Sequence, residues 1–212
     1  MVRTNIRRND TTFLHKDDPI IAPLPYLRFK LSNVEIASDK VKLFFIRNLF
    51  WEFDIRADYR GHDYEANGMS DRKKSVFGGF AFRFLVFKFE WLKDIMNQSR
   101  GDSLSLMLAV PIVYTSKVTV MAQAENEYWS RKYVDYYFGV RAYEVAENRP
   151  AFQGQKAISN CYQLTTMIKL SQKLMLRNNL SYRVYDPNIH HSPTVKTSHE
   201  YEGIIGFVYE FL

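Results

Sequence analysis

The chain has 212 residues, a formal net charge of +6, and an unusually large aromatic share of 16%, with 16 Phe, 14 Tyr and 3 Trp. No apolar run approaches the ~20 residues that a membrane-spanning helix needs, which excludes a helical membrane protein but leaves a transmembrane β-barrel open. Lys and Arg are scattered singly, so nucleic acid is not an expected partner, and the single Cys161 rules out an intramolecular disulfide or a cysteine zinc site.

The chain begins with a polar segment, MVRTNIRRNDTTFLHKDDP, which has basic residues but no apolar stretch. It is not a secretory signal peptide as written, so in an exported protein the signal would have been removed, lie upstream or have been replaced. We expect residues 1–19 to be a flexible polar leader and residues 20–212 to form one domain.

The clearest strand is FWEFDIRADYR, residues 50–60. Its odd positions from 51 to 59 are apolar or aromatic, and its even positions from 52 to 60 are all charged. Successive side chains of a strand point to opposite faces, so this segment has one apolar and one ionised face. A soluble sandwich would put the apolar face on a core, whereas an outer-membrane barrel would turn it to lipid.

Similar segments follow along the chain at regular spacing. They are IIAPLPYLRFKL, VKLFFIRNL with blurred alternation, SVFGGFAFRF, VFKFEWLKD, SLSLMLAVPIVY, KVTVMAQAENE, ISNCYQLTTMIKL, KLMLRNNLSYRVY and HEYEGIIGFVYEFL. Pro111 is expected to mark a bulge or a strand end. Residues 128–152 interrupt the pattern; VRAYEVAEN within them predicts a short helix, and the aromatic residues predict a girdle with a rim loop, or a docking surface for a periplasmic partner.

About ten strands of this length, without β-α-β alternation, predict an all-β fold: a closed antiparallel up-and-down transmembrane β-barrel with a polar lumen and a lipid-facing aromatic exterior. The expected lumen residues are Glu52, Asp54, Arg56, Asp58, Arg60, Lys88, Glu90, Arg177 and Arg183. The expected lipid-facing or girdle residues are Trp51, Phe53, Tyr59, Phe87, Phe89, Trp91, Phe207, Tyr209 and Phe211. The charged face is either an internal salt-bridge ladder, which we favour, or a path for solutes.

The carboxy end supports the same interpretation. Gly206, Tyr209 and Phe211 in GIIGFVYEFL resemble the terminal signal by which bacterial outer-membrane barrels are recognised for assembly, although Leu212 follows the aromatic residue. An exposed aromatic strand at the end of a soluble protein would favour aggregation.

Three segments resemble the MltA-interacting protein (MipA/OmpV) family of Gram-negative outer membranes: YVDYYFGVRAYEVAENRPAFQG (133–154), GMSDRKKS (68–75) and IHHSPTV (189–195). The matching positions are Gly68, Met69, Asp71, Arg72, Tyr137, Phe138, Gly139, Val140, Pro150, Ser192 and Pro193. His190 and His191 stand where the family carries an acidic residue.

The resemblance implies an outer-membrane β-barrel in contact with lipid or lipopolysaccharide. It also implies a scaffold role that joins a murein hydrolase to a murein synthase in the periplasm; other members are treated as porin-like proteins, adhesins or antigens. No catalytic residue comes with the resemblance.

The candidates for chemistry are weak. His62-Asp63 and His190-His191 lie in polar loops without a metal-binding spacing. Ser192 follows His191 directly, which does not make a triad, and no GxSxG motif occurs. We therefore expect no metal, cofactor or enzyme activity: a scaffold is the leading function, a small-solute channel or adhesin the alternative, and an outer-membrane lipase the third.

Overall fold

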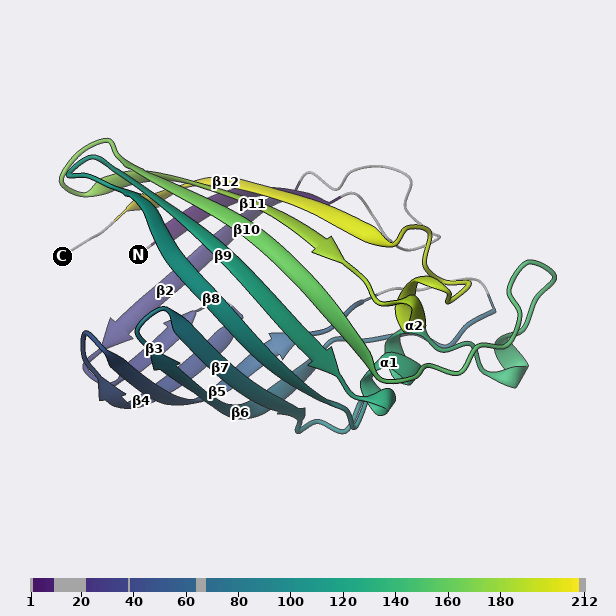
Figure 1. Ribbon diagram of the computed structural model, residues 1–212. Coiled ribbons are helices and arrows are strands. Elements are labelled where there is room, and N and C mark those ends of the chain that lie inside the picture. Colours follow the sequence, from purple (N-terminus) through teal and green to yellow (C-terminus); the bar gives the residue numbers. More distant parts are fainter. Residues whose placement is uncertain (1, 10–21, 38, 64–67, 210–212) are drawn as a thin grey trace.

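The computed structural model describes residues 2–9, 22–37, 39–63 and 68–209, and these form one closed antiparallel sheet (Figure 1). Each strand pairs with its neighbours in sequence, and β1 also pairs with β12, which closes the ring. The twelve strands are β1 (Val2–Asn9), β2 (Ala22–Leu31), β3 (Val34–Ala37), β4 (Lys40–Arg47), β5 (Trp51–Arg60), β6 (Ser75–Phe84), β7 (Phe87–Asp94), β8 (Asp102–Tyr114), β9 (Val118–Trp129), β10 (Ala157–Lys169), β11 (Leu174–Val184) and β12 (His199–Tyr209).

The strand count differs from the expected ten because two strands are hard to recognise in the sequence. The strand β1 lies in the polar segment for which we expected a flexible leader, and β3 has only four residues. The strand β3 does alternate, with Glu35 and Ala37 buried, but it is much shorter than the segments that the sequence analysis counted. The segment that contains β1 is polar overall, so a strand was not expected there.

Two bulges interrupt the ladders, and the first explains the blurred alternation of VKLFFIRNL. The β4–β5 ladder shifts register between Phe44 and Ile46, and the β8–β9 ladder shifts between Pro111 and Val113. A bulge adds one residue to one strand, so the side chains beyond it change phase. The prediction of a bulge at Pro111 is confirmed, since proline has no N–H to give to a ladder.

The barrel has two unlike ends. Short connections at 48–50, 85–86, 115–117 and 170–173 lie at one end, where Tyr209 pairs with both Val2 and Leu174. The described parts of the longer connections, at 61–63, 68–74, 95–101, 130–156 and 185–198, lie at the other (Figure 1). The long-connection end therefore holds most of the chain outside the strands.

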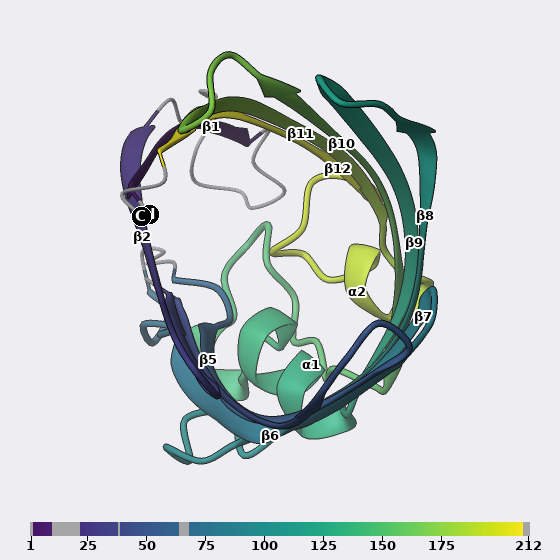
Figure 2. The same ribbon diagram turned by 90° about the vertical axis from the view of Figure 1, so that its left-hand side faces the viewer.

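The helices belong to these long connections. They are α1 (Arg131–Phe138), the 3₁₀ turn η1 (Ala142–Glu144) and α2 (Pro187–His190). Seen along the barrel, α1 and α2 lie within the ring of strands (Figure 2). None of the helices in the described part of the chain is long and apolar enough to span a membrane. The helix predicted in residues 140–148 is reduced to η1, and the longer helix begins nine residues earlier.

Candidate functional site

Charged side chains of alternate strands meet on the concave face of the sheet. Arg56 on β5 binds both carboxylate oxygens of Asp54, at 2.6 and 2.7 Å, and one of Glu90 on β7 at 2.5 Å. Lys88 also binds Glu90, at 2.6 Å. Asp54, Arg56 and Glu90 are at most 9% exposed.

The chain of ion pairs continues around the wall. Arg60 on β5 binds Glu127 on β9, and Arg183 on β11 approaches Glu127 to 3.3 Å and donates to Ser159 Oγ at 2.9 Å. Strands four positions apart are separated by roughly 19 Å along a sheet, so the Arg60–Glu127 pair must cross the concave side. The even face of β5 therefore lines the lumen.

We call this set the lumen network: Asp54, Arg56, Arg60, Lys88, Glu90, Glu127 and Arg183. Of the other predicted lumen residues, Asp58 is 8% exposed, and Glu52 lies 3.8 Å from both Arg47 and Arg83. Arg177 faces the interior in register with Met167 and Gly206, apart from the network. The alternating cations and carboxylates offset one another's desolvation cost.

The predicted lipid-facing residues are on the opposite face. The exposed fractions are 41% for Trp51, 54% for Tyr59, 52% for Phe87, 37% for Phe89, 52% for Phe207 and 40% for Tyr209. Phe53 and Trp91 are half-buried by neighbouring rings, with Phe80 against each at 6.3 and 5.8 Å between ring centroids. Phe211 lies outside the described residues.

An apolar core fills the long-connection end of the lumen, where the sequence predicted polar residues. It consists of Phe77, Leu92, Trp129, Tyr133, Val134, Tyr137, Phe138, Ala157, Tyr185, Ile189 and Val195. Four of these come from α1, which buries Tyr133, Val134, Tyr137 and Phe138 along one helical face. We call residues 61–63, 68–74, 130–156 and 185–198 the cap.

The interpretation of residues 128–152 as an aromatic girdle is therefore wrong for four of their eight aromatic residues. Trp129, Tyr133, Tyr137 and Phe138 are at most 3% exposed. They stack on one another instead, with 5.1 Å between the ring centroids of Trp129 and Tyr133. A girdle residue must face the lipid, but the alternation along β9 places Trp129 on the lumen face, like Glu127. Trp129 therefore packs against the cap and does not belong to a girdle.

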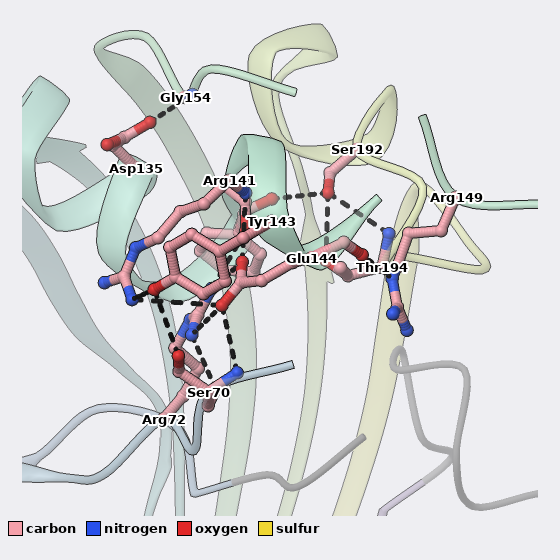
Figure 3. Close-up of polar contacts among 12 residues, drawn as sticks. Ser70, Arg72, Asp135, Arg141, Tyr143, Glu144, Arg149, Gly154, Ser192 and Thr194 are labelled. Atoms are coloured by element: carbon pink, nitrogen blue, oxygen red, sulfur yellow. Dashed lines mark hydrogen bonds and ion pairs between the residues drawn. The ribbon is translucent and has the colours of Figure 1, made fainter. Parts of the chain in front are cut away.

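A buried ion pair joins two segments of the cap (Figure 3). Arg72 donates to Glu144 through Nη1 at 3.0 Å and Nη2 at 2.8 Å, and both side chains are fully buried. The same guanidinium donates to the carbonyls of Ser70 at 2.6 Å and Gly139 at 3.1 Å. This two-point contact fixes the orientation of both groups.

Backbone groups complete the environment of Glu144. The N–H groups of Ser70 and Arg141 donate to its carboxylate at 3.0 and 2.9 Å. Burial by itself would raise the pKa of Glu144, but the hydrogen bonds from Arg72, Arg141 and Ser70 outweigh it and lower the pKa to about 2. Glu144 therefore remains ionised inside the cap.

The three family-like segments converge in this cap. Arg72 binds the carbonyl of Gly139, and Ser192 Oγ donates to the carbonyl of Phe138 at 2.5 Å. Val140 bridges to Phe152, which returns the chain after the η1 turn. Gly68 has a φ of +74°, which favours glycine. Met69 and Pro193 are half-buried, whereas Asp71 and Pro150 are exposed.

Of the histidine and serine candidates, His62 and Ser192 occupy structural positions, whereas His191 is exposed. His62 lies against the rings of Tyr137 and Phe138, at 5.5 and 5.3 Å. Burial, with the positive charges of Arg183 and Arg60, lowers the pKa of His62 to about 3. Ser192 is 2% exposed and hydrogen-bonded to Thr194 as well as to Phe138. No cluster of three or more potential metal-ligating side chains occurs among the residues that the structure describes.

Two important residues were missed in the sequence. Glu127 continues the polar face of KVTVMAQAENE, so extending the alternation by one step would have placed it in the lumen. Glu144 gives no comparable signal, because its partner Arg72 lies 72 positions earlier in the chain.

Comparison with known proteins agrees with this architecture. Residues 11–211 match the family described as MltA-interacting protein MipA. A "24 kDa outer membrane protein" of Pasteurella multocida (strain Pm70) is 26% identical over 120 residues, which cover 56% of this chain and 47% of that protein. The chain thus matches about half the length of this curated relative.

Among solved structures, one titled as the NanC porin covers 100% of both chains with a TM-score of 0.54 and 9% identity. This likeness concerns the fold alone. OmpT of Vibrio cholerae, an outer-membrane protein, covers 88% of this chain and 63% of its own at a TM-score of 0.43 and 10% identity. The chain belongs to the MltA-interacting protein MipA family and is a β-barrel protein of the Gram-negative outer membrane.

Proposed function

We propose that this protein is a non-enzymatic outer-membrane scaffold that holds murein-remodelling enzymes at the inner surface of the membrane. The match to a family described as MltA-interacting supports a murein enzyme as the partner. The filled lumen supports a barrel that serves as an anchor, since ion pairs and the cap core occupy space that a solute would need.

The two ends of the barrel have different roles in this proposal. Outer-membrane barrels have short turns on the periplasmic side and longer loops outside. The cap then faces the exterior, and residues 128–152, most of which belong to the cap, do not supply the periplasmic docking surface that their aromatic content suggested. The partner instead meets the short-turn end, where the termini of the described barrel lie.

The single observation that carries the proposal is a set of exposed apolar side chains in or directly beside these short turns. Leu49 is 80% exposed, Phe50 53%, Tyr114 83% and Leu170 52%. Arg83 binds the carbonyls of Asn48 and Leu85, so two of the turns are held together. Exposed apolar side chains on a fixed surface are typical of contact sites for proteins.

A binding assay with the barrel in nanodiscs tests the scaffold. A purified murein hydrolase should bind wild-type protein, and Leu49→Asp with Tyr114→Asp should weaken binding about tenfold or more, as expected for losing central apolar contacts. Val145→Ser, exposed at the opposite end, is the matched control. Equal binding by the double variant would contradict the proposed surface, and no binding by wild type would contradict the scaffold.

A small-solute channel is the second candidate, and the inner wall of β10 and β11 favours it. Gln163 donates to Asn179 at 2.5 Å, and Thr165 donates to the same residue at 2.7 Å; all are polar and uncharged. Such a wall can be hydrated. Stepwise conductance of wild-type protein in planar bilayers would favour the channel, and its absence would favour the scaffold.

A further inference from the structure

The outer wall of the barrel has a recess between β8 and β12. Its volume is about 510 Å³, and it is lined mainly by Leu108, Val110, Ala122, Ala124, Tyr162, Leu164, Leu180, Tyr182 and Tyr201. The strands β8, β9 and β10 run side by side along the near wall in Figure 1. The side chains that line the recess are on the strand face opposite to the lumen network, so the recess lies on the membrane-facing side.

The register of the strands explains why the wall is hollow there. One cross-strand row contains Leu108, Ala124, Tyr162, Tyr182 and Tyr201, and the next contains Val110, Ala122, Leu164, Leu180 and Gly203. Both rows face outward, because they alternate with lumen residues such as Glu125 and Cys161. In each row β9 contributes only alanine, which leaves a groove between the large side chains of β8 and β10.

A polar pair lies at one end of this groove. The row on the long-connection side contains Asn126 and Asn160, which face outward and are joined by a hydrogen bond from the Asn126 amide to the Asn160 carbonyl oxygen. Beyond them the wall is apolar again, with Tyr128 and Ile158 in register. Each amide group has two donors, and one bond between the residues leaves donors for another molecule.

We propose that this groove binds one acyl chain of a membrane lipid, with the carbonyl linkage of that chain at Asn126 and Asn160. The chain would lie over Ala122 and Ala124, and its headgroup would point toward the cap. This inference needs only the outer-membrane location and does not depend on the scaffold or on the channel.

The physical reasons are the surroundings and the polar pair. In a membrane, hydrocarbon already surrounds the wall, so the hydrophobic effect does not favour a chain in the groove over a chain elsewhere in the bilayer. An unfilled recess, however, lacks dispersion contacts, and a chain that fits the groove restores them. Amide donors facing hydrocarbon are costly unless they are bonded. An acyl chain with a carbonyl at one end can both fill the groove and accept hydrogen bonds from the amides. A second copy of the protein would need a narrow projecting ridge of side chains that ends in a polar group.

Native mass spectrometry of the full chain folded in detergent micelles tests the proposal. Two probes, a phosphatidylethanolamine and lipid A, are titrated separately, because both carry acyl chains with carbonyl linkages. We expect one retained lipid per chain with at least one probe. Ala124→Phe, which fills the groove, should lower retention about tenfold, and Asn126→Leu with Asn160→Leu should lower it several-fold.

Ala57→Phe is the matched control, because Ala57 faces outward on β5, away from the groove. It should retain lipid as wild type does. Heat-modifiable gel migration verifies that each variant is folded, and Ala122→Leu replaces Ala124→Phe if the larger side chain prevents folding. Undiminished retention in the folded groove variant would overturn the proposal, as would a lipid-free dimer that this variant dissociates.

Discussion

The Arg72–Glu144 pair provides the sharpest test of how the cap is held. In Glu144→Gln the side chain keeps its shape but loses its charge, while Arg72 remains fully buried. Removing one partner of a buried pair leaves an uncompensated charge, which typically costs about 3–5 kcal/mol. The cap should then open more often, whereas the barrel strands keep their ladders.

The depressed pKa of Glu144 expresses the same interaction and leads to a similar magnitude. Its ordinary value is 4.5, and the cap lowers it to about 2. Each pKa unit corresponds to about 1.4 kcal/mol, so the folded cap favours the ionised carboxylate by about 3 kcal/mol at neutral pH. A loss of this size raises the open population of the cap about a hundredfold.

Hydrogen exchange followed by mass spectrometry measures this opening. Peptides covering α1 and residues 139–152 should lose about a hundredfold in protection, and peptides from β10 should be unchanged. Tyr143→Phe is the control: this ring is 70% exposed, and its hydroxyl bonds to Ser70 and Arg141 lie at the surface. Unchanged exchange in Glu144→Gln, or an equal loss in β10, would refute the reasoning.

Acid should reproduce the effect in the wild-type protein. Because the folded pKa of Glu144 is depressed, its stabilisation is complete above the ordinary value of 4.5 and is lost as pH falls toward 2. The protection factor of the cap amides, which is the exchange rate corrected for its intrinsic pH dependence, should therefore fall between these values. Glu144→Gln should lack this dependence, and a pH profile identical to that of wild type would contradict the assignment.

Two further predictions concern the lumen and the packing of the cap. Arg56→Met should leave the carboxylates of Asp54 and Glu90 without their shared cation and lower the free energy of unfolding by about 3 kcal/mol or more, measured by urea titration in lipid vesicles; unaltered stability would count against the lumen network. Gly154→Ala should place a Cβ against the backbone nitrogen of Asp135 and displace α1. Trypsin should then cleave residues 130–156 faster while barrel migration on gels is retained, and wild-type cleavage rates would show that the site tolerates the methyl group.

Local pattern alone predicted the strands whose two faces differ in chemistry. In β5 every second residue is charged, and the period of two is a property of the extended backbone itself. The bulge at Pro111 was also predictable, because proline lacks the donor that a ladder requires. The sequence thus determined the all-β class, the faces of the strong strands and the membrane-barrel interpretation.

Tertiary structure decided what fills the barrel. Trp129, Tyr137 and Phe138 are aromatic residues near a strand end, a composition that a lipid girdle and an internal core share. Arg72 and Glu144 are each an ordinary charged residue until the closed ring brings their segments together. A short stretch of sequence shows the period of a strand. A contact between residues 72 positions apart, such as Arg72 and Glu144, forms only when the intervening chain folds back on itself, so no short stretch of sequence can predict it.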